Sequence, residues 1–151
     1  MMSQIRVTKS FGFETGHALY GHDGLCKNIH GHSYKLYVTV IGKPINDMNH
    51  AKNGMVIDFK DLKTIVKSEI VDVFDHAMVL NNNSPHSELA TVLSKQEHKV
   101  VRVDYQPTCE NMVIDFANRI TSMLPSHIKL FKVRLNETAT AYAEWYAKDQ
   151  E

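Results

Sequence analysis

A cysteine and two histidines stand close together in the segment LCKNIHGHSY, residues 25–34. Three residues separate Cys26 from His30, and a single glycine separates His30 from His32. Imidazole nitrogens and thiolates are common ligands of zinc and other divalent metals. A thiol can also act as a base or nucleophile, or lie buried and inert. The segment therefore indicates a metal site, the surroundings of a nucleophile, or a polar strand end.

Two strands are expected to position these histidines. Hydrophobic and polar residues alternate over residues 5–13 and again over 32–41, which predicts a strand in each place. If the first strand continues, His17 falls on the face that Phe13 occupies. Side chains two apart on a strand share a face at about 6.5–7 Å, so His30 and His32 could share one ion. Antiparallel pairing would then bring His17 beside them.

Three histidines with no obvious fourth ligand are typical of a zinc site that keeps one position open for water or substrate. A closed structural site more often has four ligands, usually with cysteines among them. An isolated H-x-H pair also arises by chance. For Cys26 three roles stay open on the residues alone: a fourth metal ligand, an inert thiol, or a base or nucleophile.

The remaining elements predict the fold class. Helical spacing runs through residues 57–74, with Asp58 as its N-cap, and through 107–124, with Thr108 as its cap and Pro125 as its stop. A turn-rich stretch, a short helix and a short strand are expected between these helices. Residues 129–136 and 139–147 predict a hairpin. We expect an α+β fold: a four-stranded antiparallel sheet with two helices on one face, in the order ββααββ.

Composition limits the classes of protein. The 151 residues predict one domain, 1–151, and the 17 basic and 17 acidic residues cancel. This balance gives no broad electrostatic surface for nucleic acid or an anionic membrane. No apolar run approaches a membrane span of about 20 residues, and the N-terminal sequence lacks the layout of a signal peptide. Two cysteines do not make a disulfide framework, so free thiols in a reducing cytoplasm are expected.

Five short motifs in this order carry a family resemblance: FETGHAL, CKNIHGHSY, FDHAMVLN, PTCEN and LNET. Together they resemble the family of 6-pyruvoyl-tetrahydropterin and 6-carboxy-tetrahydropterin synthases. The resemblance extends from about Phe11 to Trp145, which is nearly the whole chain. It implies the tunnelling fold, with trimers whose sheets form one barrel, stacked as hexamers, and with active sites between subunits.

The resemblance also implies roles for individual residues. Cys26 matches the catalytic cysteine, which moves protons and forms no covalent bond. Asp75 and His76 match an acid–histidine pair that supports proton transfer. The cofactor implied is Zn²⁺, and its three ligands match His17, His30 and His32.

Three more residues match the pterin pocket. Glu137 matches the glutamate that grips the pterin ring and is sometimes drawn into the proton relay, and Thr108 and Glu110 match the pocket lining. Each has a plainer interpretation as well. Glu137 could be a solvated acid at a strand end, while Thr108 and Glu110 suit a helix cap and a first-turn acid. The five histidines outside the motifs are expected to face solvent: His22, His50, His86, His98 and His127.

The implied reaction uses dihydroneopterin triphosphate. The spacing from Cys26 to His30 is that of the bacterial carboxy-forming enzymes of queuosine biosynthesis, whereas the animal pyruvoyl enzymes have five intervening residues. Asn136 departs from the bacterial pattern, which more often has lysine before the glutamate. A carboxy-forming zinc lyase that releases acetaldehyde and triphosphate is therefore favoured over the pyruvoyl-forming reaction. A zinc hydrolase and a non-catalytic metal-binding relative are the alternatives from other classes; the hydrolase leaves Cys26 without a task.

Overall fold

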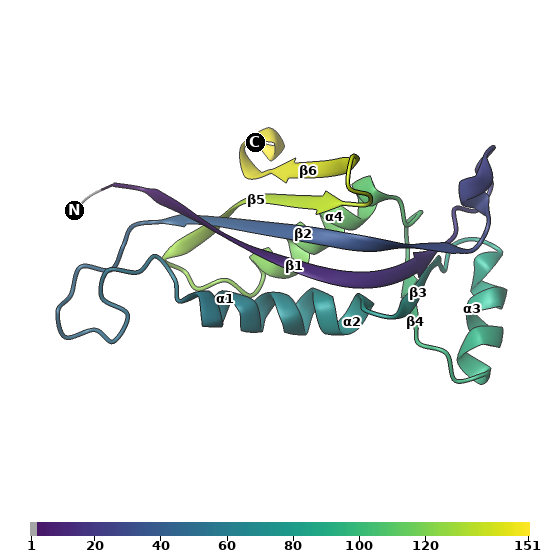
Figure 1. Ribbon diagram of the computed structural model, residues 1–151, viewed down its shortest axis with the longest axis horizontal. Coiled ribbons are helices and arrows are strands. Elements are labelled where there is room, and N and C mark those ends of the chain that lie inside the picture. Colours follow the sequence, from purple (N-terminus) through teal and green to yellow (C-terminus); the bar gives the residue numbers. More distant parts are fainter. Residues whose placement is uncertain (1–2) are drawn as a thin grey trace.

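The structure is a computed structural model that describes residues 3–151. Its centre is a six-stranded sheet in the order β4-β3-β1-β2-β5-β6 (Figure 1). The strands are β1 (Ile5–His17), β2 (His30–Gly42), β3 (Ala77–Asn81), β4 (Val100–Val103), β5 (Ile128–Asn136) and β6 (Tyr142–Tyr146).

The two central strands, β1 and β2, form a long antiparallel pair of 13 residues each. Their register places His17 opposite His30 and Thr15 opposite His32. Residues directly opposite in an antiparallel pair project from the same face of the sheet. The predicted strands are therefore confirmed, and β1 does continue as far as His17.

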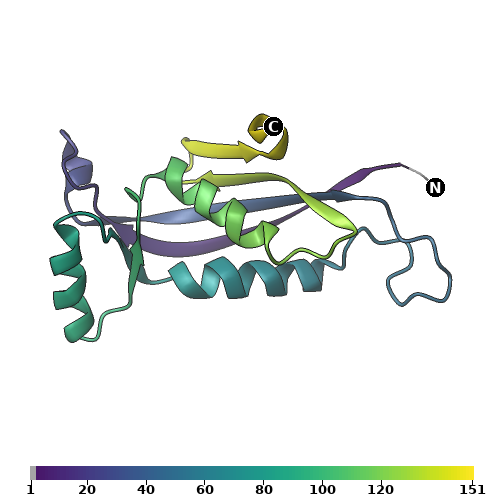
Figure 2. The same ribbon diagram turned by 180° about the vertical axis from the view of Figure 1, so that it is seen from behind.

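Helical segments cover one face of this sheet. The first runs without a break through α1 (Phe59–Val66), a π-helical stretch (Lys67–Val71) and α2 (Asp72–Phe74), and it lies beside α4 (Cys109–Thr121) (Figure 2). The predicted caps form: the Asp58 carboxylate accepts from the N–H of Lys60, and the Thr108 hydroxyl accepts from the N–H of Asn111. Short 3-10 turns occupy Leu25–Lys27 and Ala147–Gln150.

The core lies between these helices and the sheet. Phe74 of α2 and Phe13 of β1 both meet Phe116 of α4 edge to face, with ring centroids 4.9 and 6.1 Å apart. The helices contribute a buried stripe at helical spacing, and the strands contribute every second residue, as amphipathic elements require. The buried strand residues include Tyr34, Leu36, Val38, Val133 and Leu135.

The sheet is larger than the sequence predicts, and it is not purely antiparallel. Two extra strands extend it beyond β1, because β3 pairs parallel with β1 and β4 pairs parallel with β3. The four-stranded sheet with two helices is therefore wrong in its counts, although the α+β class and the helix-covered face hold. The expected short helix and short strand are α3 (His86–Lys95) and β4. No sequence pattern predicts β3, since its four apolar residues lack any alternation.

The molecule is elongated, and different segments project at its two ends (Figure 1). The loop over residues 43–58 projects at one end, where β1 begins (Figure 1). The loop over residues 18–29 and helix α3 project at the other end, where β1 stops and β2 starts (Figure 1). Among residues 3–151, no helix is long and apolar enough to cross a membrane.

Candidate metal centre and adjoining pocket

Three histidines converge at the second of these ends. One ring nitrogen from each of His17, His30 and His32 lies within 4.8 Å of the others. His17 is 1% exposed, while the other two are partly exposed. The strand register brings them together, since His17 faces His30 directly and His32 follows two residues along the same face.

Backbone carbonyls orient two of the rings. Nδ1 of His17 lies 2.7 Å from the carbonyl oxygen of Pro107, and Nδ1 of His30 lies 2.7 Å from that of Asn28. A carbonyl can only accept, so each Nδ1 carries the proton and each Nε2 presents a lone pair when the ring is neutral. Burial lowers the pKa of His17 to about 4, which keeps that ring neutral near pH 7. This outer-shell arrangement is typical of metal-ligating histidines.

The facing lone pairs fit a bound cation. Nε2 of His17 lies 3.0 Å from Nε2 of His30. Two neutral rings with both Nδ1 atoms protonated would repel each other at this distance unless a positive charge lay beside both. Zn–N bonds of 2.0–2.1 Å give an N···N separation of about 3.3 Å in tetrahedral geometry. The three histidines therefore fit a divalent metal that imidazole prefers, such as zinc.

A carboxylate stands next to the three rings. Oε1 of Glu137 lies 3.6 Å from Nε2 of His32 and 3.8 Å from Nε2 of His17. Glu137 follows directly after β5, and its side chain is 28% exposed. The Glu137 side chain therefore faces inward, and the solvated-acid interpretation does not fit its place beside two buried or partly buried imidazoles.

One pocket of about 310 Å³ gathers most of the remaining predicted residues. Its lining includes His17, Cys26, Thr108, Glu110 and Glu137. Cys26 is exposed rather than buried, so the inert-thiol interpretation does not apply. Thr108 is also the cap of α4, so the plainer interpretation of that residue is correct as well.

Sequence reasoning missed other members of this pocket. Cys109 lines it, and its thiol donates to the carbonyl of Leu135 at 3.2 Å; burial raises the pKa of Cys109 to about 11. His22 lines it too, and its side chain is exposed, as expected. His22 lies four residues before Cys26 in the same loop, and this spacing could have indicated that it belongs to the pocket.

Tyr34 packs against the candidate metal centre. It is 2% exposed, and its ring meets those of His17 and His32 edge to face, with centroids 6.4 and 5.5 Å apart. Its hydroxyl has no hydrogen-bond partner among the described residues. Burial and the neighbouring Glu137 charge both raise the pKa of this phenol, so the ring stays neutral and forms an apolar wall for the site.

The predicted acid–histidine pair forms, but it lies apart from this pocket. Nδ1 of His76 is 3.0 Å from Oδ1 of Asp75. That same carboxylate oxygen accepts from the N–H of Glu14 at 2.9 Å, and this bond is the main cause of the lowered pKa of Asp75. His76 lines a second pocket of about 520 Å³ that also includes His32 and Lys99, and neither Cys26 nor Glu137 belongs to it. One chain thus does not bring His76 to Cys26.

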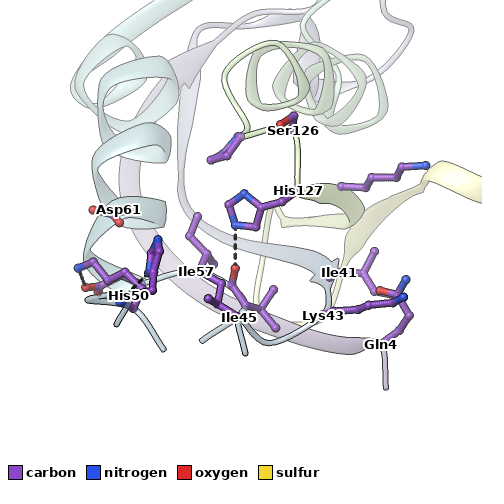
Figure 3. Close-up of a pocket in the computed structure, with 15 residues that line it drawn as sticks. Gln4, Ile41, Lys43, Ile45, His50, Ile57, Asp61, Ser126 and His127 are labelled. Carbon is purple, nitrogen blue, oxygen red and sulfur yellow. Dashed lines mark hydrogen bonds and ion pairs between the residues drawn. The ribbon is translucent and has the colours of Figure 1, made fainter. Parts of the chain in front are cut away.

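A larger pocket lies at the opposite end of the molecule. It measures about 880 Å³ and lies beside the loop over residues 43–58 (Figure 3). His127 points into it and donates from Nε2 to the carbonyl of Val56 at 3.3 Å (dashed line in Figure 3). The candidate metal centre among the described residues is elsewhere, so size alone does not mark the site of chemistry.

The other histidines outside the motifs differ among themselves. His50, His98 and His127 are exposed, as expected. His86 is not, because its Nδ1 is buried without a hydrogen-bond partner in the described chain, and its ring packs against Tyr20 with centroids 5.3 Å apart. Its position at the start of α3 turns the ring inward, which a loop assignment could not reveal.

Known proteins resemble this chain over nearly all of its length. A protein from Haemophilus influenzae named 6-carboxy-5,6,7,8-tetrahydropterin synthase is 39% identical over 141 residues, covering 93% of this chain and 97% of that protein. Proteins of the same name from Aquifex aeolicus and Rickettsia bellii are 31% and 30% identical, with 92% and 93% of this chain covered and 96% and 99% of theirs.

Solved structures share the fold. An uncharacterized protein from Wolinella succinogenes superposes with a TM-score of 0.80 at 20% identity, covering 96% of this chain and 99% of that one. The 6-pyruvoyl tetrahydropterin synthase of Caenorhabditis elegans gives 0.67 at 23% identity, with 97% of each chain covered. The family model described as 6-pyruvoyl tetrahydropterin synthase matches residues 6–148. The chain therefore belongs to the 6-pyruvoyl tetrahydropterin synthase family.

Proposed function

We propose that this protein is a zinc-dependent 6-carboxy-5,6,7,8-tetrahydropterin synthase. It would convert 7,8-dihydroneopterin triphosphate to 6-carboxy-5,6,7,8-tetrahydropterin and release acetaldehyde and triphosphate. The observation that carries the proposal is the convergence of three imidazoles on one point beside a pocket that also holds a thiol and a carboxylate. The names of the relatives at 30–39% identity support the carboxy-forming reaction.

Each pocket residue has a task that suits its chemistry. A divalent ion held by His17, His30 and His32 would polarise side-chain oxygens of the substrate and acidify the adjacent protons. The carboxylate of Glu137 offers two acceptor oxygens to the ring N–H and amino group of a pterin. The exposed thiol of Cys26 removes and returns protons at the substrate side chain.

Asp75 and His76 would assist this proton transfer from a neighbouring copy of the chain. Within one chain His76 lines a different pocket from Cys26, so a shared site requires a second subunit. The family resemblance implies active sites between subunits, which agrees with this separation. We therefore propose a homo-oligomer, a trimer or a dimer of trimers, in which each site uses His76 of the adjacent subunit.

The test is turnover by the purified, zinc-loaded protein. With dihydroneopterin triphosphate as the substrate, we expect stoichiometric acetaldehyde, triphosphate and the carboxypterin, detected by aldehyde derivatisation and mass spectrometry. Triphosphate with a pyruvoyl product and no acetaldehyde would instead identify the pyruvoyl-forming reaction. Formation of neither product by a preparation with one zinc per chain would overturn both lyase assignments.

A further inference from the structure

The backbone on either side of the peptide bond that joins Asp75 to His76 has an unusual conformation. Asp75 has φ −63° and ψ 129°, and His76 has φ 57°. These angles match the central positions of a type II turn, whose third residue is normally glycine or asparagine. A flip of the central peptide would convert this turn toward type I, with a negative φ at His76, and would redirect the imidazole.

Two contacts hold this peptide, one on each side. Its N–H, which belongs to His76, donates to the carbonyl of Glu14 at 2.6 Å. Its carbonyl, which belongs to Asp75, accepts from Nζ of Lys99 at 2.7 Å. A flip would break both bonds at once, so together they oppose it.

Lys99 is itself well anchored. Its ammonium also donates to the carbonyl of Asp72 at 2.7 Å, which uses two of its three protons on the carbonyls at the end of α2. Its own carbonyl accepts from the N–H of Met78 at 3.0 Å, which fixes the lysine backbone to the start of β3. A cation at a helix C-terminus is electrostatically favourable. The side chain is therefore held by both charge and geometry.

From these contacts we propose that Lys99 is a positioning residue for His76. It holds the Asp75–His76 peptide in the type II orientation, so that the imidazole points toward the pocket shared with His32 and the subunit neighbour. The link to catalysis rests on the proposed function, whereas the clamp on the peptide does not. A lysine that served only to cap α2 would affect stability and leave the imidazole in place.

The test compares Lys99→Met with Lys67→Met. Lys67 provides a matched control because its Nζ pairs with the side chain of Asp72, 3.1 Å away, in the same helical segment but without touching the Asp75–His76 peptide. In Lys99→Met we expect the His76 amide hydrogen to exchange at least about tenfold faster, as local opening becomes easier. We also expect kcat to fall by about tenfold with little change in KM, because misplacement of a catalytic group lowers the rate more than substrate binding. In Lys99→Arg we expect the His76 amide exchange rate and kcat to stay close to their wild-type values, because the guanidinium can donate to the same two carbonyls.

Each outcome of this comparison either supports or overturns the proposed role of Lys99. Faster exchange with lower kcat in Lys99→Met, rescued by Lys99→Arg and absent in Lys67→Met, supports the proposal. Exchange equal to that of Lys67→Met overturns it, and so does faster exchange with an unchanged kcat. If the wild-type protein does not turn over the pterin triphosphate, the proposed function fails, and the exchange comparison alone decides whether Lys99 holds the peptide. Should Lys99→Met not fold, Lys99→Ala gives the same comparison with another side chain that cannot donate.

Discussion

The two nitrogens of His17 have separate partners. Nδ1 donates to a backbone carbonyl, and Nε2 points to the meeting point of the three rings. Burial keeps the ring neutral, which is the form that binds metal. Because the carbonyl of Pro107 comes from a segment far along the chain, the tautomer of this histidine depends on the tertiary fold.

Replacement of His30 should abolish tight metal binding. In His30→Ala only two imidazoles remain, so we expect zinc affinity to fall by at least about 100-fold, more than the usual loss of an outer-shell partner. Metal content after dialysis against a weak chelator measures this. His50→Ala, an exposed histidine far from the site, is the control. Equal zinc content in His30→Ala and wild type would remove the three-histidine site from consideration.

The two cysteines should differ in reactivity and in importance. Cys26 is exposed in the pocket, whereas burial raises the pKa of Cys109 to about 11. We expect alkylation at neutral pH to modify Cys26 first. Cys26→Ala should lower kcat by about 10²–10⁴, the usual contribution of a positioned acid or base, with zinc content unchanged. Cys109→Ala is the comparison, and a larger kcat loss there than in Cys26→Ala would contradict the assignment.

Asp75 gives a pH dependence whose sign follows from its contacts. The N–H of Glu14, with smaller contributions from His76 and Lys99, lowers the pKa of this carboxyl in the folded state. A lowered pKa stabilises the fold above the ordinary carboxyl value of about 4 and ceases to do so as pH falls through the folded value. The stability loss in Asp75→Asn should therefore be larger near neutral pH than in acid, as measured by denaturant unfolding. The exposed Asp149→Asn should show no such difference.

At the scale of elements, α4 begins at the pocket. Thr108 caps the helix through Asn111 and also lines the cavity, so one residue connects helix stability with the site.

A bulge in the sheet changes which residues of β5 face the core. A register shift between Thr39 and Val40 marks a bulge in the β2–β5 pairing. Leu130 is therefore buried, whereas Phe131 lies under the guanidinium of Arg6.

Replacement of Thr108 separates its two possible roles. Thr108→Ala should destabilise the protein by about 1 kcal/mol, because the N-cap is lost. Thr108→Ser keeps a capping hydroxyl and should restore stability. If the cap is the only role, KM for the pterin substrate will be unchanged in both variants once they are folded. A raised KM in both, at full stability in Thr108→Ser, would instead support a direct contact with the ligand.

In the molecule as a whole, the candidate catalytic residues are divided between two pockets at one end of the sheet. Cys26 and Glu137 line one, and His76 lines the other. The candidate metal centre contributes to both, since His17 lines the first and His32 the second. Under the proposed function, a single chain would present two partial sites around one group of histidines, which suits the proposed oligomer.

Mixing two inactive variants tests this arrangement. Cys26→Ala and His76→Ala should each be inactive alone. After they are unfolded and refolded together, about a quarter of subunit contacts should pair an intact thiol with an intact imidazole, and activity should return in proportion. A mixture of Cys26→Ala with Cys26→Ser gives the background. No recovery in a co-assembled mixture would place both residues in the site of one chain.

Much of the local structure follows from patterns among residues that are neighbours along the chain. Alternation predicted β1 and β2, and helical spacing with the Asp58 and Thr108 caps predicted the two main helical segments. The strand parity of His17, His30 and His32 was also readable, because antiparallel pairing of two long strands leaves few registers. These features depend on neighbours in sequence or on one pairing of strands.

The other features of the fold and of the candidate site depend on how distant segments meet in the folded chain. The parallel strands β3 and β4 carry no alternation, because their packing depends on what covers each face. The carbonyl that orients His17, the lysine that holds the Asp75–His76 peptide and the separation of His76 from Cys26 all depend on contacts between distant segments. Local sequence patterns do not encode such contacts, because they form only when the chain is folded.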